Sequence, residues 1–278
     1  MASSSLVSSE EFKLFKQSIQ RKSCVILQKP WQYYQSGPKT GAPLICLHSS
    51  TGTAESFFRQ MNSLSCRGYS VISPTLPAIF SVDEFIKSFE LFLAHLNCRK
   101  IHLFGVGLGG FLSQAIAAAK PTLVLSMILC NSFCDTQFFV NHKNPLMNAM
   151  PAFALRRKFL ANFPLDEVLP EIADSADFVV QFLHTLDRST LLSRYSLHTT
   201  PHVVPKLQLD DSKITILDAC DVSSLPADVR NEVYKRYPQA KRATIKKGGE
   251  FVILANSDEV SMFTQIHLRN YEASLCNE

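Results

Sequence analysis

The stretch that decides the fold is Ile101-His102-Leu103-Phe104-Gly105-Val106-Gly107-Leu108-Gly109-Gly110-Phe111. A mostly apolar run leads into four glycines within six positions, and an apolar helical pattern follows. The whole chain of 278 residues has only 10 glycines, whereas soluble proteins average roughly 7%. Glycine that is scarce elsewhere and clustered here indicates a turn whose backbone only glycine fits. The stretch therefore predicts a buried strand, a tight turn and a helix in succession.

The glycine cluster permits three interpretations. Gly105, Gly107 and Gly110 satisfy the dinucleotide-binding pattern G-x-G-x-x-G, which needs an acid about 20 residues later. That region, residues 129–132, has no acid, so this interpretation is disfavoured. The second interpretation is a nucleophile elbow, G-x-S-x-G, with Gly105 and Gly109 as its flanking glycines and Gly107 in place of the serine. The third is a purely structural turn. It makes the same prediction as the second, because an elbow with glycine at its apex has no attacking atom and serves only the fold.

Short apolar runs alternate with helical patterns along most of the chain. Buried strands are expected at residues 44–47, 70–72, 101–104, 124–129, 214–217 and 243–245, with an antiparallel pair at 24–27 and 31–34. Helices are expected at 82–96, after a capping box that begins at Ser81, and at 109–119, 228–237 and 258–270. Continuous apolar runs are typical of parallel strands covered on both faces. The predicted class is therefore α/β, with a mostly parallel central sheet and helices on both faces.

The chain is predicted to have one domain with one insertion. Residues 23–278 form the domain, and residues 1–22 form an N-terminal extension that is free to be flexible. From about 138 to 205 no convincing strand occurs, and helical patterns cover 153–163 and 175–186. This segment is interpreted as a helical lid inserted between two strands.

A hydrolase elbow predicts an oxyanion loop after an early strand. The sequence from His48 to Gly52 resembles the H-G-x-x-G loop, with Ser49 at the first glycine. Backbone N–H groups there can form a polar hole, although an ordinary capped loop is an equally good explanation. The candidate residues of this vestigial hole and its pocket are His48, Ser49, Ser50, Thr51, Gly52, Val106 and Leu108.

The elbow also predicts an acid and a histidine at later strand ends. Asp221 is the better match for the acid, with Asp218 close behind. The histidine should follow Gly248-Gly249, but Glu250 stands there, and a carboxylate does not relay a proton as imidazole does near neutral pH. Gly107, Asp221 and Glu250 are therefore vestigial triad positions, and Gly105, Gly109 and Gly110 are assigned to close packing. The competing interpretation is an Asp221–Glu250 pair that activates water. Two carboxylates without histidines are too few ligands to predict a metal, and no other cofactor is expected.

Composition excludes several other classes of protein. The net charge of +4 is small, and no long basic run with interleaved aromatic residues points to nucleic-acid binding. No apolar run reaches the roughly 20 residues that span a bilayer, and the Ser-rich start is unlike a secretory signal. The eight cysteines contain no C-x-x-C pair. We therefore expect a cytosolic protein without a zinc site.

Several strings resemble the maspardin family, a non-typical group within the α/β-hydrolase superfamily. They include residues 50–60, 102–114, 128–133, 150–153 and 237–243, and the likeness runs from about Trp31 to Tyr271. The resemblance implies an α/β-hydrolase fold and a cytosolic protein with peripheral association to endosomal and trans-Golgi membranes. It also implies protein partners, namely a receptor cytoplasmic tail and an aldehyde dehydrogenase relative.

Members of that family lack the histidine after the glycine pair, and vertebrate members keep serine at the elbow, where this chain has Gly107. The hypothesis is therefore a non-catalytic binding or adaptor protein. A hydrolase of unconventional mechanism, or a carrier of a small apolar ligand, is the alternative.

Overall fold

The fold is described from a computed structural model that covers residues 5–161, 163, 169–221 and 225–272. One sheet contains eight strands in the order β1-β2-β4-β3-β5-β6-β7-β8. Their bounds are β1 (Lys22–Ile26), β2 (Lys29–Ser36), β3 (Leu44–Leu47), β4 (Val71–Thr75), β5 (Ile101–Val106), β6 (Val124–Cys130), β7 (Ile214–Ala219) and β8 (Lys241–Ile245). β1 is antiparallel to β2 and β2 is antiparallel to β4, whereas the six strands from β4 through β3 to β8 run parallel to one another. The expected strands and their mostly parallel arrangement are confirmed.

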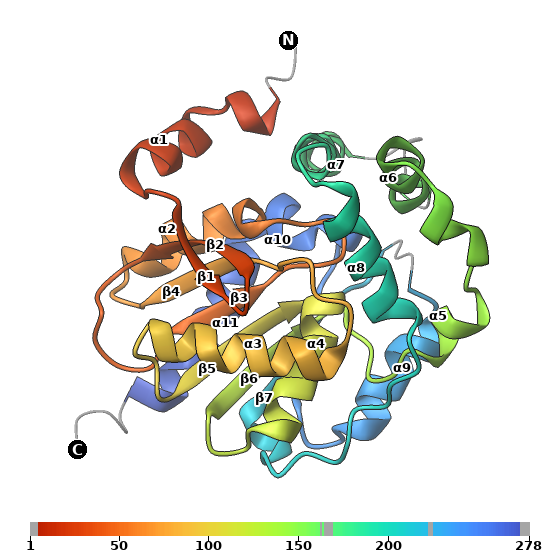
Figure 1. Cartoon of the computed structure of the whole chain (residues 1–278). Coiled ribbons are helices and arrows are strands. Elements are labelled where there is room, and N and C mark those ends of the chain that lie inside the picture. Colours follow the sequence, from red (N-terminus) through yellow and green to blue (C-terminus); the bar gives the residue numbers. More distant parts are fainter. Residues whose placement is uncertain (1–4, 162, 164–168, 222–224, 273–278) are drawn as a thin grey trace.

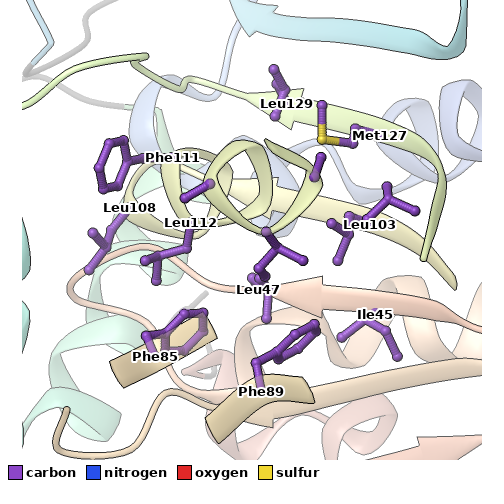
Figure 2. Packing of buried hydrophobic residues seen from close by; sticks show 14 of the residues in the cluster. Ile45, Leu47, Phe85, Phe89, Leu103, Leu108, Phe111, Leu112, Met127 and Leu129 are labelled. Atoms are coloured by element: carbon purple, nitrogen blue, oxygen red, sulfur yellow. The ribbon is translucent and has the colours of Figure 1, made fainter. Parts of the chain in front are cut away.

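Helices cover both faces of the sheet because the strand side chains alternate between two apolar cores. Ile45 and Leu47 of β3 face one core with α3 (Val82–His95), α4 (Leu108–Ala119) and α9 (Ala227–Arg236). Figure 2 shows Phe85 and Phe89 of α3 beside these two strand residues. The intervening Leu44 and Cys46 face the second core, with α2 (Phe58–Ser65), α10 (Val252–Ala255) and α11 (Ser257–Glu272).

The insertion between β6 and β7 is helical, as expected, but its boundaries differ from the prediction. It contains α5 (Gln137–Asn141), α6 (Ala152–Leu160), α7 (Pro170–Leu183) and α8 (Arg188–Thr199). The sequence pattern extended α7 to residue 186 and missed α8. Asp187 separates the two helices. Its carboxylate accepts a hydrogen bond from the N–H of Thr190 and so caps the N-terminus of α8. In Figure 1, α6 and α7 lie together at one side of the molecule, and α8 runs from them toward α3 and α4, whose core Leu197 of α8 joins.

The N-terminal segment contains a packed helix. The short turn η1 (Leu6–Ser8) leads into α1 (Glu10–Ser18), which Ser9 caps by accepting from the N–H of Phe12. Phe12 packs edge-on against Phe58 of α2 and against Phe178 of α7, at ring-centroid distances of 5.0 and 5.1 Å. The sequence permits a flexible extension over residues 1–22; residues 1–4 lie outside the described range, and α1 instead packs between the body of the domain and the lid.

Candidate functional site

The glycine cluster forms a sharp turn between β5 and α4, as the elbow interpretation requires. Gly107 is the residue between them, with φ +51° and ψ −114°. This conformation is strained for any residue with a side chain and is accessible to glycine. The N–H of Gly107 donates to the carbonyl of Cys130 at 2.9 Å, and its own carbonyl accepts from Phe111 N–H at 3.1 Å. The turn therefore has the backbone of a nucleophile elbow and no nucleophile at its apex.

The neighbouring glycines permit very close backbone contacts. A Cβ placed on Gly109 would lie 2.0 Å from the carbonyl oxygen of Leu47. A Cβ on Gly105 would lie 2.4 Å from the carbonyl oxygen of Gly109, and one on Gly110 would lie 2.4 Å from Ser132 Oγ. Gly107 differs, because its Cβ would lie 3.5 Å from the Cβ of Ser49, an ordinary van der Waals distance. Space for a serine side chain is thus present at the apex, and only the backbone conformation disfavours it.

The loop expected to be an oxyanion loop lies next to the elbow and is fixed from within. His48 is buried; one ring nitrogen, Nδ1, is 2.7 Å from the carbonyl of Ser49, and the other, Nε2, accepts from the N–H of Leu76 at 2.9 Å. Burial keeps the pKa of His48 well below its ordinary value of 6.5, so the ring is neutral. With both ring nitrogens engaged, His48 positions the loop.

A buried arginine from the lid holds the same loop from outside. Arg194 of α8 is 0% exposed, and its Nη1 donates to the carbonyls of Ser50 and Gly52, each at 2.8 Å. Burial lowers the pKa of this guanidinium to about 9, which still leaves it charged at neutral pH. The sequence analysis missed Arg194, because one arginine in an amphipathic helix carries no sign that it will be buried.

The acid position supports the glycine pair and has no histidine to orient. Asp221 Oδ2 accepts from the N–H of Gly248 and Oδ1 from the N–H of Gly249, both at 2.7 Å. The other candidate, Asp218, is buried; its Oδ1 accepts from Asn131 N–H at 3.0 Å and its Oδ2 accepts from the hydroxyl of Tyr234. Burial raises the pKa of Asp218. Both carboxylates therefore brace backbone or neighbouring side chains.

Asn131 connects the three strand ends around the elbow and was also missed. It follows β6 with a positive φ of 43°, which asparagine tolerates better than most residues. Its Nδ2 donates to the carbonyl of Gly249 at 2.9 Å, and its Oδ1 accepts from the N–H of Ala219 at 3.2 Å. The sequence pattern around Asn131 gives no sign of these hydrogen bonds.

A cavity of about 390 Å³ lies between the elbow and the lid. Seven of the residues singled out from the sequence line it: Ser49, Ser50, Thr51, Val106, Gly107, Leu108 and Glu250. His48, Gly52 and Asp221 do not line it. Most of the remaining wall is apolar and comes from the lid and from the segment after β8, with Phe139, Met147, Phe159, Phe163 and Phe251 as its large members. The structure thus brings the oxyanion loop, the elbow apex and Glu250 to one apolar cavity.

His198 of α8 lines this cavity from the lid side. Its Nε2 is buried and has no hydrogen-bond partner in the described part of the chain. Its ring packs against Phe139 and Phe133, with centroids 4.6 and 5.3 Å away. Burial lowers the pKa of His198 to about 4, so it is a neutral, mostly apolar wall at physiological pH.

The described residues contain no group of three or more His, Cys, Asp or Glu side chains placed to hold a metal ion. Over the same residues, the helices are too short or too polar for any of them to cross a bilayer.

Known proteins resemble this chain in sequence, in fold or in both. A profile of the family described as alpha/beta hydrolase fold matches residues 42–255. Maspardin of Danio rerio is 39% identical over 275 residues, which cover 96% of this chain and 88% of that protein. Maspardin of Homo sapiens is 38% identical, with 96% and 89% covered. Among solved structures, the enol-lactonase from Burkholderia xenovorans superposes with a TM-score of 0.75 at 11% identity, over 89% of this chain and 100% of its own.

Proposed function

The chain belongs to the maspardin family of α/β-hydrolase-fold proteins, and from that premise we propose that it is a non-catalytic binding or adaptor protein. It acts through protein partners in endosomal and trans-Golgi trafficking or in the regulation of receptor signalling. It is cytosolic, with peripheral association to those membranes. The partners suggested by the family are a receptor cytoplasmic tail and an aldehyde dehydrogenase relative.

The observation that carries the non-catalytic proposal is the apex of the elbow. Gly107 keeps the elbow backbone, at φ +51°, and offers no oxygen or sulfur to attack a carbonyl. Loss of the nucleophile alone removes almost all covalent catalysis in hydrolases of this kind. The neighbouring close contacts of Gly105, Gly109 and Gly110 are unaffected by that loss, so the fold persists without the reaction.

The remaining triad positions support the same proposal. Glu250 lines the cavity where a general base belongs, but a carboxylate there has no imidazole-like relay to a nucleophile. Asp221 accepts from two backbone N–H groups and does not line the cavity. This geometry weighs against the competing mechanism in which Asp221 and Glu250 activate a water between them.

The apolar cavity supports a second candidate function, the carriage of a small apolar ligand. Its volume of about 390 Å³ lies in the usual range for small-molecule sites, about 300–1,000 Å³. Aromatic side chains from the lid and from the segment after β8 line it, and Ser49 and Thr51 are among its few polar groups. Native mass spectrometry of the purified chain should then show a bound apolar molecule, which the cavity-filling substitution Val106→Phe should remove.

An esterase assay tests the absence of catalysis. We expect the purified chain to hydrolyse p-nitrophenyl acetate and butyrate no faster than a heat-inactivated sample. Turnover that disappears in Asp221→Ala or Glu250→Gln, but survives in the control Asp177→Ala on the exposed face of α7, would overturn the proposal.

A direct binding assay tests the partner side of the proposal. The purified chain is expected to bind an immobilised receptor-tail peptide or the aldehyde dehydrogenase relative from its own source, and part of the protein should sediment with endosomal and trans-Golgi membranes. Absence of both interactions, together with a fully soluble distribution in cells, would contradict the adaptor role.

A further inference from the structure

A second cavity, of about 1120 Å³, lies at the opposite edge of the sheet from the elbow. Pro43 directly precedes β3, Lys100 precedes β5 and Lys213 precedes β7, and all three residues line it. Since these strands are parallel, their amino ends share one edge and their carboxyl ends, with the elbow, share the other. The two cavities are therefore separated by the length of the strands, and occupation of one leaves the other accessible.

The side chains that line this second cavity carry positive charge and no negative charge. Five of the described lining residues are Lys or Arg, and none is Asp or Glu: the cations are Lys22, Lys39, Arg99, Lys100 and Lys213. None of the five forms an ion pair with a described residue. Five uncompensated cations around one concave surface create a strongly positive local potential.

The contacts that these cations do make are with neutral oxygens. Lys22 Nζ donates to Gln35 Oε1 at 2.9 Å, and Lys100 Nζ donates to the carbonyl of Thr122 at 2.6 Å. Such contacts orient the ammonium groups and leave their charge in place. Lys39 and Arg99 are exposed and make no hydrogen bond within the described residues, so both are available to a ligand.

Asp210 is an acid that lies close enough to Lys213 to interact with its charge. Asp210 is exposed, and the positive charge of Lys213 contributes to lowering its pKa, after the larger effect of its hydrogen bonds with Ser212. Asp210 does not line the cavity, and a fully solvated carboxylate is strongly screened. It therefore offsets part of the charge of Lys213 and leaves the other four cations unopposed.

The cations come from separate segments, which suggests the shape of the ligand. Lys22 begins β1, Lys39 lies in the loop before β3, Arg99 and Lys100 lie between α3 and β5, and Lys213 precedes β7. This arrangement surrounds a hollow, whereas a linear polyanion such as nucleic acid is bound by cations in a row. A single phosphate would occupy a small part of about 1120 Å³. Several Lys and Arg residues around one hollow match an anion with several phosphate groups.

We propose that this cavity binds a compact molecule with several phosphate groups, of the inositol polyphosphate class. Asn97 and Gln35 add neutral amide donors for the phosphate oxygens between the charged groups. The same chemistry is present in a free inositol polyphosphate and in the headgroup of a phosphoinositide lipid. The site goes beyond the proposed function, because neither the elbow nor a protein partner takes part in it.

Calorimetric titration of the full chain with inositol hexakisphosphate tests the proposal. We expect saturable binding that the double substitution Lys39→Gln/Arg99→Gln weakens by about tenfold or more, because two close charges are lost. The matched control Lys13→Gln/Lys246→Gln removes the same charge from exposed positions that line neither cavity. It should weaken binding by less than about twofold, since distant exposed charges are screened.

Vesicles distinguish the two sources of the phosphate groups. The probes are phosphatidylcholine vesicles with phosphatidylinositol bisphosphate, and vesicles with phosphatidylserine at equal charge. Binding to the first kind alone, competed by inositol hexakisphosphate, assigns a lipid headgroup, and binding of the soluble probe without any vesicle binding assigns a free polyphosphate. No binding of inositol hexakisphosphate, or an equal loss in the control variant, would overturn the proposal and leave the cations as partners of the nearby helix carboxyl ends.

Discussion

The two edges of the sheet are built by different physical means. At the carboxyl edge, backbones approach so closely that a Cβ on Gly109 would lie 2.0 Å from a carbonyl oxygen, and Arg194, Asp221 and Asn131 all bind backbone groups. At the amino edge, five cations surround an open hollow without an ion pair among the described residues. One edge is determined by shape and the other by charge.

This difference predicts at which edge amino-acid substitutions should be tolerated. Substitutions of Gly109, Arg194, Asp221 or Asn131 at the carboxyl edge should cost stability, because Gly109 lies in close backbone contact and the other three side chains satisfy backbone groups. Substitutions of exposed cations at the amino edge should leave the fold intact and change only what binds.

The largest effect is expected from Gly109→Ala. The added methyl group would overlap the carbonyl oxygen of Leu47, and both atoms belong to packed backbone that cannot move independently. We expect a loss of about 4 kcal/mol or more in the free energy of unfolding, measured by urea denaturation. The control Gly68→Ala has nothing within 4 Å and only a positive φ of 87° to accommodate, so it should cost about 1 kcal/mol. Equal losses in the two variants would refute the distinction between the edges.

Acidification should weaken both edges. Burial lowers the pKa of His48 and His198 at the carboxyl edge and of His102 and His267 at the other, to about 4 for His102 and His198 and about 3 for His267. The unfolded chain therefore takes up protons below about pH 6.5 while the folded chain does not. Stability is fully present above that pH, and we expect urea denaturation to show a loss of about 2 kcal/mol for each of these histidines between about pH 7 and pH 5.

Single substitutions can assign that pH dependence to its sources. His102→Gln and His198→Gln should each reduce the slope of stability against pH by up to one proton. A slope that none of the buried histidines alters would mean that carboxylates cause the acid sensitivity.

A smaller effect is expected from Gly107→Ser at the apex of the elbow. The side chain has space, at 3.5 Å from Ser49 Cβ, but the backbone conformation at φ +51° is strained for serine. We expect a loss of about 1–3 kcal/mol in thermal or urea denaturation and no gain in esterase rate. A gain in stability would show that the turn does not keep the elbow conformation.

The smallest effect is expected from Lys39→Gln/Arg99→Gln. Both side chains are exposed and bind no described residue, so the free energy of unfolding should change by no more than about 0.5 kcal/mol. The same variant should bind inositol hexakisphosphate about tenfold or more weakly. A large loss of stability would mean that these cations hold the amino edge together.

The sequence predicted the sheet well because its signals are local. Continuous apolar runs identify β3, β5, β6 and β7, and the clustered glycines identify the turn at Gly107. The lid was predicted less well: the helical pattern was extended to residue 186, beyond the end of α7 at Leu183, and α8, which begins at Arg188 after its cap Asp187, was missed. Helix α1 was missed although Ser9 and the two acids that follow it are a capping pattern. A helix this short is marginal by itself and is stabilised by its packing against other helices, which the local sequence does not show.

The sequence predicted which loop and elbow residues form the candidate site, and it did not predict the side chains that hold them in place. Elbow and loop residues follow strands whose ends meet, so their convergence on one cavity could be anticipated. Arg194 reaches the loop from a helix 142 residues along the chain from Gly52, and Asn131 bonds to Gly249 across 118 residues. The basic cavity has the same origin: its cations are spread from residue 22 to residue 213, and no local pattern unites them.

The position of α1 has a consequence for biosynthesis. Phe12 leaves the ribosome early, and its partner on α2, Phe58, follows soon afterwards, but Phe178 of α7 comes much later in the chain. At about 5–20 residues per second, the wait for α7 lasts roughly 8 to 33 s. During that time the face of the Phe12 ring that packs against Phe178 is uncovered. The nascent N-terminus therefore exposes aromatic surface that a chaperone can bind until α7 has been translated.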